Sequence, residues 1–232
     1  MRSYKATQRQ NNIEIIHNIM NDLKIISQEA NNLFRESFAE CCRIRDEISA
    51  LSDDTNNRSA IAKKNIMDSA QLSGQIIKAL DSGSLLLALI GLRSLTENCI
   101  NTKYTFAHPK KEREQLDWAN KVCDDYFKRG NDPRALKSLL NEETIKKRAQ
   151  EVGLEELYEK DFASLCNYSH MQIHTSILNK PKYIEDFTRN AYVAVLTHLH
   201  NIRNMVQEHY NIKGWEKHSN RIVEFRDKYY SD

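Results

Sequence analysis

Glycine and proline are scarce in this sequence, with six and three residues among 232. An all-β fold needs many tight turns, which these two residue types favour, whereas helices need few. Long apolar runs are also missing. The most apolar run, Leu85 to Leu92, is too short to cross a bilayer, and Met1 to Asn12 lacks the apolar stretch of a signal peptide. The composition therefore predicts an all-α, soluble, cytoplasmic protein with no membrane partner.

A predominant sign of charge is absent too. The 34 basic and 32 acidic residues are interspersed and give a net charge of +2, so no strong overall field draws the chain to nucleic acid. The five cysteines are an odd number without a C-x-x-C pair, which favours reduced thiols. No glycine-rich phosphate loop or nucleophile elbow occurs, and we expect no cofactor.

The segment from Arg9 to Leu51 has apolar residues alternately three and four positions apart, interrupted only by Ser37. This spacing predicts one long amphipathic helix. If unbroken it would extend for roughly 60 Å at about 1.5 Å per residue, more than a compact domain needs. Either part of it projects and pairs with another chain, or it folds back or kinks. We therefore divide the chain into an oligomerisation or partner arm, 1–58, and a helical bundle, 59–232.

The rest of the chain predicts further helices and no strand. They are expected at 60–80, 85–107, 112–128, 133–140, 142–151, 154–159, 161–178, 184–210 and 215–229. The helix at 85–107 begins with L-L-L-A-L-I-G-L, apolar on every side, which is typical of a helix surrounded by other helices. The fold class expected is a multi-helix bundle with a long N-terminal helix and a buried central helix.

Arg93 and Glu97 stand four residues apart on this central helix and can form an ion pair. Buried ions need partners, so the pair is either a polar clamp between helices or part of a functional site. A ligand-binding cluster with Tyr168 and Ser169 is one such site.

The segment Y-S-H-M-Q-I-H-T-S contains His170 and His174 on one helical face. No glutamate follows the first histidine as H-E-x-x-H requires, so we expect no metal. Instead, His174 would point toward Arg93 and Glu97 as a proton donor or acceptor, with His170 nearer solvent.

Arg203 and His209 form an R-x5-H spacing on the last long helix. In metal-independent RNA cleavage, a histidine can move the 2′-hydroxyl proton while an arginine stabilises the phosphorane charge. The spacing is common by chance. The alternative is a solvated arginine followed by a histidine that the helix dipole favours.

The stretch G-L-R-S-L-T-E-N-C-I-N-T-K-Y resembles a bacterial helical family of unknown function whose central helix carries R-S-x-x-E. The later Y-S-H-M-Q-I-H-T-S resembles that family's second signature. The matching positions are Arg93, Ser94, Glu97, Tyr104, Tyr168, Ser169, His174 and Ser176. The helical plan is also similar to the HEPN superfamily, which includes RNA-cleaving toxins, antiphage effectors and non-catalytic partners, and whose R-x(4-6)-H signature Arg203 and His209 fit.

The resemblance implies a bacterial toxin or defence protein that acts on RNA, with His209 or His174 as acid or base and Arg203 or Arg93 on phosphate. The alternative is a non-catalytic interaction module, such as an immunity protein, antitoxin or complex subunit. This module would form a homo-oligomer or bind a protein partner through the N-terminal helix.

Overall fold

The computed structural model describes residues 2–51, 58–108, 110, 145–163, 165 and 181–230, with side chains at the start of the chain from residue 17 onward. These residues contain no β-strand, which confirms the predicted all-α class. In chain order the elements are α1 (Arg2–Leu51), α2 (Arg58–Asp81), α3 (Leu85–Ala107), α6 (Ile145–Glu151), α7 (Glu155–Leu157), the π-helix η1 (Tyr158–Ala163), α10 (Pro181–Tyr210) and α11 (Glu216–Tyr229).

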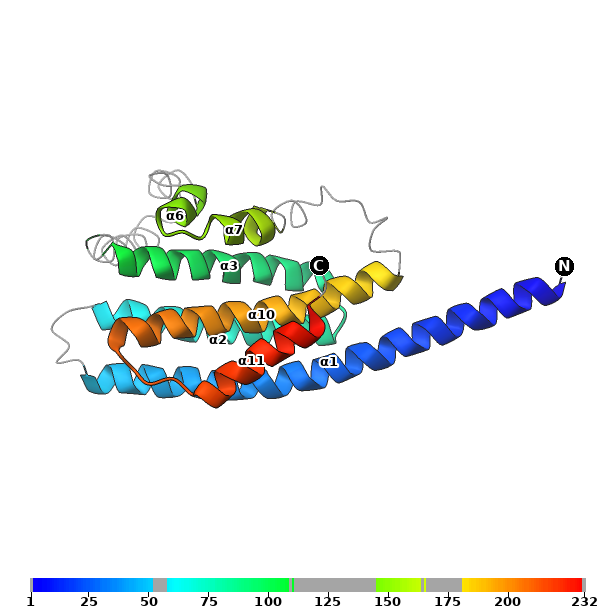
Figure 1. The fold of residues 1–232 in the computed structure, drawn as a ribbon, viewed down its shortest axis with the longest axis horizontal. Helices are drawn as coiled ribbons and strands as arrows, with labels where there is room; N and C mark the ends of the chain where they lie inside the picture. Colours follow the sequence, from blue (N-terminus) through cyan, green and yellow to red (C-terminus); the bar gives the residue numbers. More distant parts are fainter. Residues whose placement is uncertain are drawn as a thin grey trace, which may run out of the picture.

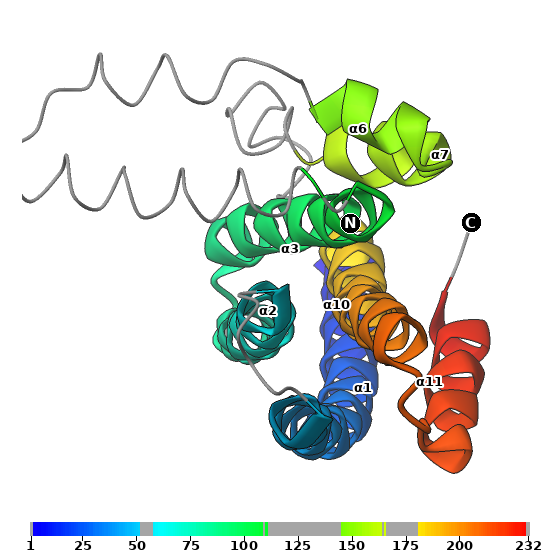
Figure 2. The ribbon, with the colours of Figure 1, turned by 90° about the vertical axis from the view of Figure 1, so that its left-hand side faces the viewer.

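Four long helices, α1, α2, α3 and α10, form the body of the molecule. Each packs on its neighbours around a shared interior, and α10 contacts all three others. Figure 2 views this bundle close to its axis, with α11 outside it beside α1 and α10. The short elements α6, α7 and η1 cover the outer side of α3 (Figure 1). The predicted multi-helix bundle is therefore confirmed.

Helix α1 is a single uninterrupted element that begins before the predicted Arg9 and ends at the predicted Leu51. Its apolar stripe is buried from Ile26 to Ile48, where it faces α2 and α10. Before Ile26 no described side chain is buried, and this part extends past the end of the bundle as an arm (Figure 1). The arm therefore comprises residues 2–25, and the second half of α1 belongs to the bundle.

Helix α3 has the predicted bounds, but its first turns are not enclosed on every side. Leu87 is 63% exposed, and Leu86 and Ile90 are also exposed. The expectation of a helix surrounded by others was wrong there, because helices α2 and α10 contact only one face of these turns. Further along, one face of α3 is buried, including Leu92, Leu95 and Cys99.

Two apolar clusters fill the bundle one after the other along α1. The first includes Ile26, Ala30 and Leu33, and the second begins with Cys41 and Ile44. The buried side chains of α1 between the clusters, Ser37 and Glu40, are polar. A polar layer thus interrupts the core where α1, α10 and α11 meet.

The reversal from α10 into α11 uses a left-handed residue after the helix. Asn211 has φ 52, and the amide of Ile212 donates to the carbonyl of Gln207 while that of Asn211 donates to Glu208. These are the two hydrogen bonds of a Schellman motif. Its left-handed position is usually occupied by glycine and sometimes by asparagine. The buried side chain of Ile212 adds the usual apolar contact, and the chain turns back toward α1.

Several predicted elements lie outside the described residues. These are the helices at 112–128 and 133–140 and nearly all of that at 161–178. In the part of the chain that the structure describes, no helix has both the length and the apolar character needed to cross a bilayer.

Candidate functional site

Arg203 is the one buried lysine or arginine among the described residues, and it lies on the side of α10 that faces α1 and α11. Its exposed fraction is 0%. Its Nη2 atom contacts Nδ1 of His200 at 2.6 Å and donates to Oγ of Ser219 at 2.9 Å, whereas Nε and Nη1 have no hydrogen-bond partner among the described residues. Burial lowers the pKa of the guanidinium, and the nearby Cys41 and Glu40 oppose this change. The interpretation of Arg203 as a solvated arginine was therefore wrong.

His200 connects Arg203 to Asn204. A guanidinium N–H can only donate, so Nδ1 of His200 accepts and Nε2 carries the ring hydrogen. Burial, followed by the charge of Arg203, lowers the pKa of His200 to about 4, which keeps the ring neutral. Nε2 lies 3.0 Å from the carboxamide of Asn204. Because Nε2–H donates, we assign the carboxamide oxygen to this contact and turn the NH2 group of Asn204 away from the ring.

His218 forms the corresponding contact between α11 and α1. Its ring lies 2.8 Å from Oγ of Ser37 through Nε2 and 3.1 Å from Glu36 through Nδ1. Arg221 also donates to Glu36. Burial lowers the pKa of His218, and hydrogen bonding from Arg221 is the main cause of the lowered pKa of Glu36.

Glu40 is a fully buried carboxylate with several donors around it. It accepts from Arg43 at 2.7 and 2.9 Å, from Nε2 of Gln207 at 2.9 Å and from the backbone N–H of Trp215 at 3.2 Å. Arg43 also donates to the carbonyl of Lys213 at 2.7 Å and lies over the Trp215 ring. These contacts fix the loop between α10 and α11 to α1.

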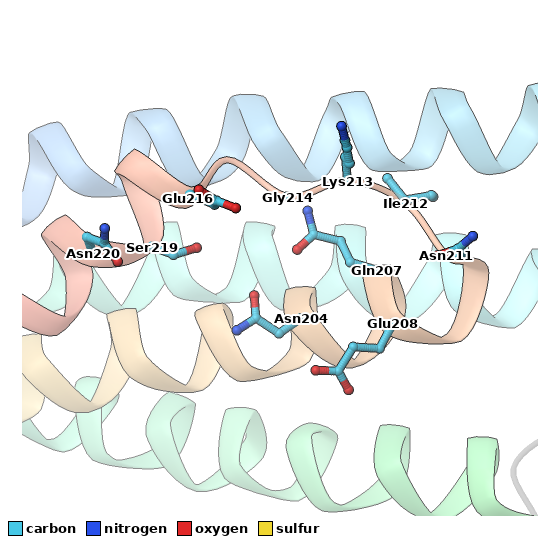
Figure 3. Close-up of a pocket in the computed structure, with 10 residues that line it drawn as sticks. All are labelled: Asn204, Gln207, Glu208, Asn211, Ile212, Lys213, Gly214, Glu216, Ser219 and Asn220. Atoms are coloured by element: carbon cyan, nitrogen blue, oxygen red, sulfur yellow. The ribbon is translucent and has the colours of Figure 1, made fainter.

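A polar pocket opens beside this layer, between the end of α10 and the start of α11. It has a volume of about 690 Å³ and is lined by Asn204, Gln207, Glu208, Asn211, Ile212, Lys213, Gly214, Glu216, Ser219 and Asn220. In Figure 3 the side chains of Ser219, Asn204 and Gln207 point toward the space between the two helices. Each of the three forms a hydrogen bond to a residue described above: Ser219 to Arg203, Asn204 to His200 and Gln207 to Glu40.

The structure does not bring Arg203 and His209 together within one chain. The Arg203 guanidinium is enclosed near α1 and α11, whereas the ring of His209 stacks on Phe106 of α3 with the ring centroids 4.2 Å apart. His209 is exposed and also meets the ring of Tyr210 edge-on. The two candidate catalytic groups thus face different neighbours.

Arg93 and Glu97 are partly buried, and neither is fully enclosed. The guanidinium carbon of Arg93 lies 5.1 Å from the centre of the Phe162 ring, so η1 covers this arginine. The remaining candidates of this cluster, Tyr168, Ser169, His170, His174 and Ser176, lie outside the described residues. The predicted cluster of His174 with Arg93 and Glu97 therefore stays a prediction.

The described cysteines are free thiols, and Cys41 and Cys99 are buried. Burial raises the pKa of each of these two to about 12, so they are poor nucleophiles. His198 is buried beside Asp161 at 3.3 Å, on a different side of α10 from His200, as the spacing of two predicts. Among the described residues, no three histidine, cysteine or acidic side chains group as metal ligands.

His200, His218 and Glu40 were not predicted from the sequence. One signal could have found the layer: Ser37 is the single polar residue in the apolar stripe of α1, and it contacts the buried His218. A lone hydroxyl on a buried face needs a polar partner, so it marks the place where other helices supply one.

Comparisons with protein-family models, curated proteins and solved structures find no match to this chain.

Proposed function

We propose that this protein is a non-catalytic helical interaction module that self-associates through the α1 arm. The observation that supports this most directly is the uninterrupted continuation of α1 beyond the bundle (Figure 1). The arm of residues 2–25 would be about 36 Å long at about 1.5 Å per residue. Helices of this length are only marginally stable in water without packing partners, so a surface that covers the arm is expected.

The apolar register of α1 continues from the bundle into the arm. Ile19 and Leu23 precede the buried Ile26, Ala30 and Leu33 at alternating spacings of four and three. This is the spacing of a coiled-coil seam, which is complementary to another copy of itself. Met20 is 65% exposed and Ile25 is also exposed, so the described part of the arm presents apolar surface. The partner proposed is therefore a second copy of the chain.

The polar layer described above suits a role in anchoring α11 to α1. Its α1 members, Glu36, Ser37 and Glu40, hold α11 and the preceding loop through His218, Arg221 and Trp215. Both ring nitrogens of His200 and of His218 contact neighbouring side chains, so neither ring is free for proton transfer.

Light scattering on the full chain tests the proposal. We expect a dimer for the wild type and for a control with Asn18→Lys and Asn21→Lys, because both asparagines are exposed. Ile19→Lys with Leu23→Lys places charges in the seam and should give a monomer in which the bundle stays folded while the uncovered arm loses helical content. A wild-type monomer at high concentration, or a dimer that survives the seam substitutions, would contradict the proposal.

RNA cleavage by Arg203 and His209 is the catalytic alternative, together with the toxin or defence setting that the HEPN resemblance implies. No contact within one chain favours it, because His209 stacks on Phe106 and Arg203 is enclosed. Non-catalytic members of that superfamily are compatible with the function proposed here.

A further inference from the structure

Three side chains at the floor of the pocket between α10 and α11 are held in place by hydrogen bonds to residues behind them, outside the pocket. Ser219 is fixed by the buried Arg203, Asn204 by the neutral His200, and Gln207 by the buried Glu40. Side chains supported in this way are preorganised, and preorganisation is what distinguishes binding sites from ordinary polar surface.

One polar atom of this floor has no partner among the described residues. Gln207 is only 6% exposed and uses Nε2 to donate to Glu40. Its Oε1 atom is directed toward Asn204 and Ser219 (Figure 3). It lies beneath Gly214, where a Cβ atom would approach Oε1 to 3.0 Å. Oε1 is not among the enclosed polar atoms that lack a partner, so this acceptor is open to the pocket and can accept from a donor there.

Donors lie beside this acceptor. Nδ2 of Asn204 lies 3.0 Å from Nε2 of His200, but the neutral ring donates from Nε2, so we exchange the oxygen and nitrogen of this carboxamide, which leaves the NH2 group facing the pocket. Ser219 accepts from Arg203 and keeps its own hydrogen to donate. An acceptor next to two donors is complementary to a peptide unit, whose N–H can donate to Gln207 and whose carbonyl can accept from Asn204 or Ser219.

The charges of the pocket favour a cation. Its lining contains the carboxylates of Glu208 and Glu216 against the single ammonium of Lys213. Among the described residues, neither carboxylate forms an ion pair, and both residues are exposed. The two carboxylates oppose the binding of phosphate at this rim, whereas Lys213 and the buried Arg203 behind Ser219 favour it, so phosphate is tested directly below; no aromatic side chain lines the pocket to stack on a base.

We propose that this pocket binds an extended peptide segment with a basic side chain, whose peptide unit pairs with Asn204, Gln207 and Ser219 and whose cation lies near Glu208 and Glu216. The proposal goes beyond self-association through the arm and does not depend on it. The pocket volume is within the usual range for ligand sites.

The test uses the full chain and a capped pentapeptide with one arginine at its centre and glycine elsewhere. The matched probe has uncharged citrulline instead of arginine, and inorganic phosphate is the third probe. NMR titration follows the side-chain NH2 signals of Asn204 and Gln207. The arginine peptide should shift both signals saturably at millimolar concentration, and the citrulline peptide should bind more weakly.

Variants locate the cation. Glu208→Gln and Glu216→Gln should each weaken binding of the arginine peptide by about two- to fivefold, as expected for exposed ion pairs, without changing the citrulline peptide. Glu224→Gln, an exposed change on α11 outside the pocket, is the control and should have no effect. Absence of saturable shifts, equal binding of both peptides, unchanged binding in the two pocket variants, or equally strong shifts with phosphate would each overturn the proposal.

Discussion

The guanidinium of Arg203 donates to Nδ1 of His200 across 2.6 Å, one helical turn earlier in α10, while Arg203 itself has no exposed surface. This contact fixes the tautomer of His200 and, through it, the orientation of Asn204. No carboxylate forms an ion pair with Arg203 among the described residues, although Glu40 and Cys41 are close enough to affect its pKa. Burying a charge without a direct counterion costs free energy. Removing this charge should therefore offset part of the stability that is lost with the side chain.

Arg203→Met should be tolerated better than Arg203→Ala. Methionine fills most of the space and removes the uncompensated charge, so we expect a change in the free energy of unfolding within about 1 kcal/mol. Both changes leave Ser219 and His200 without their donor, but alanine also leaves a cavity, so we expect it to cost about 2–4 kcal/mol. Urea denaturation measures both. Arg226→Met, an exposed change, is the control, and equal losses for methionine and alanine would show that the charge is required.

Stability should decline in mild acid because burial lowers the pKa of two histidines in the folded state. Burial, reinforced by Arg203, lowers the pKa of His200 to about 4 from 6.5, and burial also lowers that of His218. The unfolded chain therefore binds more protons between these values. Stability should be constant well above pH 6.5 and fall toward pH 4, by up to about 1.4 kcal/mol per pH unit for His200, and the lowered pKa of His218 adds to the fall in the same direction.

Denaturation between pH 7 and pH 4 checks this dependence. His200→Gln should make the fall shallower over the same range, whereas His17→Gln, on the exposed part of α1, should leave it unchanged. Glu36 has a lowered pKa as well, so its contribution is lost only below its ordinary value of 4.5. A flat stability profile down to pH 5 would contradict the neutral state assigned to His200.

The helices could be predicted from the sequence because their signals are local. The three-and-four spacing of α1 and the stops after Ala107 and Tyr210 depend on neighbouring residues only, and the structure confirms each. The exposure of Leu87 could not be predicted in this way, because it depends on which helices α3 meets in space.

The polar layer depends on contacts between distant parts of the chain. Ser37 and His218 are 181 residues apart, and Gln207 and Glu40 are 167 apart. Periodicity shows that Arg203 shares a helical face with apolar residues, but it cannot show that α11 supplies Ser219 to it. The same limit explains why Arg93 was favoured as the buried arginine over Arg203.

Glu40 and Glu47 offer a matched comparison, since both accept from Arg43. Glu40→Gln removes a buried negative charge and leaves Arg43 and the N–H of Trp215 with a weaker acceptor, so we expect a loss of about 3 kcal/mol. Glu47→Gln should cost less than about 1 kcal/mol, because that side chain is 44% exposed whereas Glu40 is fully buried. Denaturation followed by tryptophan fluorescence, with Trp118 replaced by phenylalanine in every variant so that Trp215 is the single tryptophan, reports the loop, and equal effects of the two changes would contradict the anchoring role of Glu40.

Purified protein should not cleave RNA without added metal if the module is non-catalytic. The expectation follows from the stacking of His209 on Phe106 and the enclosure of Arg203. A labelled single-stranded RNA incubated with the chain in the presence of a chelator gives the measurement. Cleavage by the wild type that disappears in His209→Ala would establish the catalytic alternative.

The close approach of α2 and α3 depends on Gly91. A Cβ atom added there would lie 2.5 Å from Cγ1 of Ile76, which is nearer than real Cβ atoms come to another atom. Gly91→Ala must therefore displace Ile76 or separate the helices, and we expect a loss of about 1–3 kcal/mol despite the better helix propensity of alanine. Ile76→Ala alone should also destabilise, by about 2–4 kcal/mol, because it opens a cavity.

Combining the two substitutions should cost less than the sum of the single losses, because the space vacated by Ile76 accommodates the new methyl group. The coupling between neighbours of this kind is about 0.5–3 kcal/mol in double-mutant cycles. Urea denaturation of the four proteins measures it. Additive losses would mean that the two helices move apart in Gly91→Ala, and that contact with the Ile76 side chain is not what restricts position 91 to glycine.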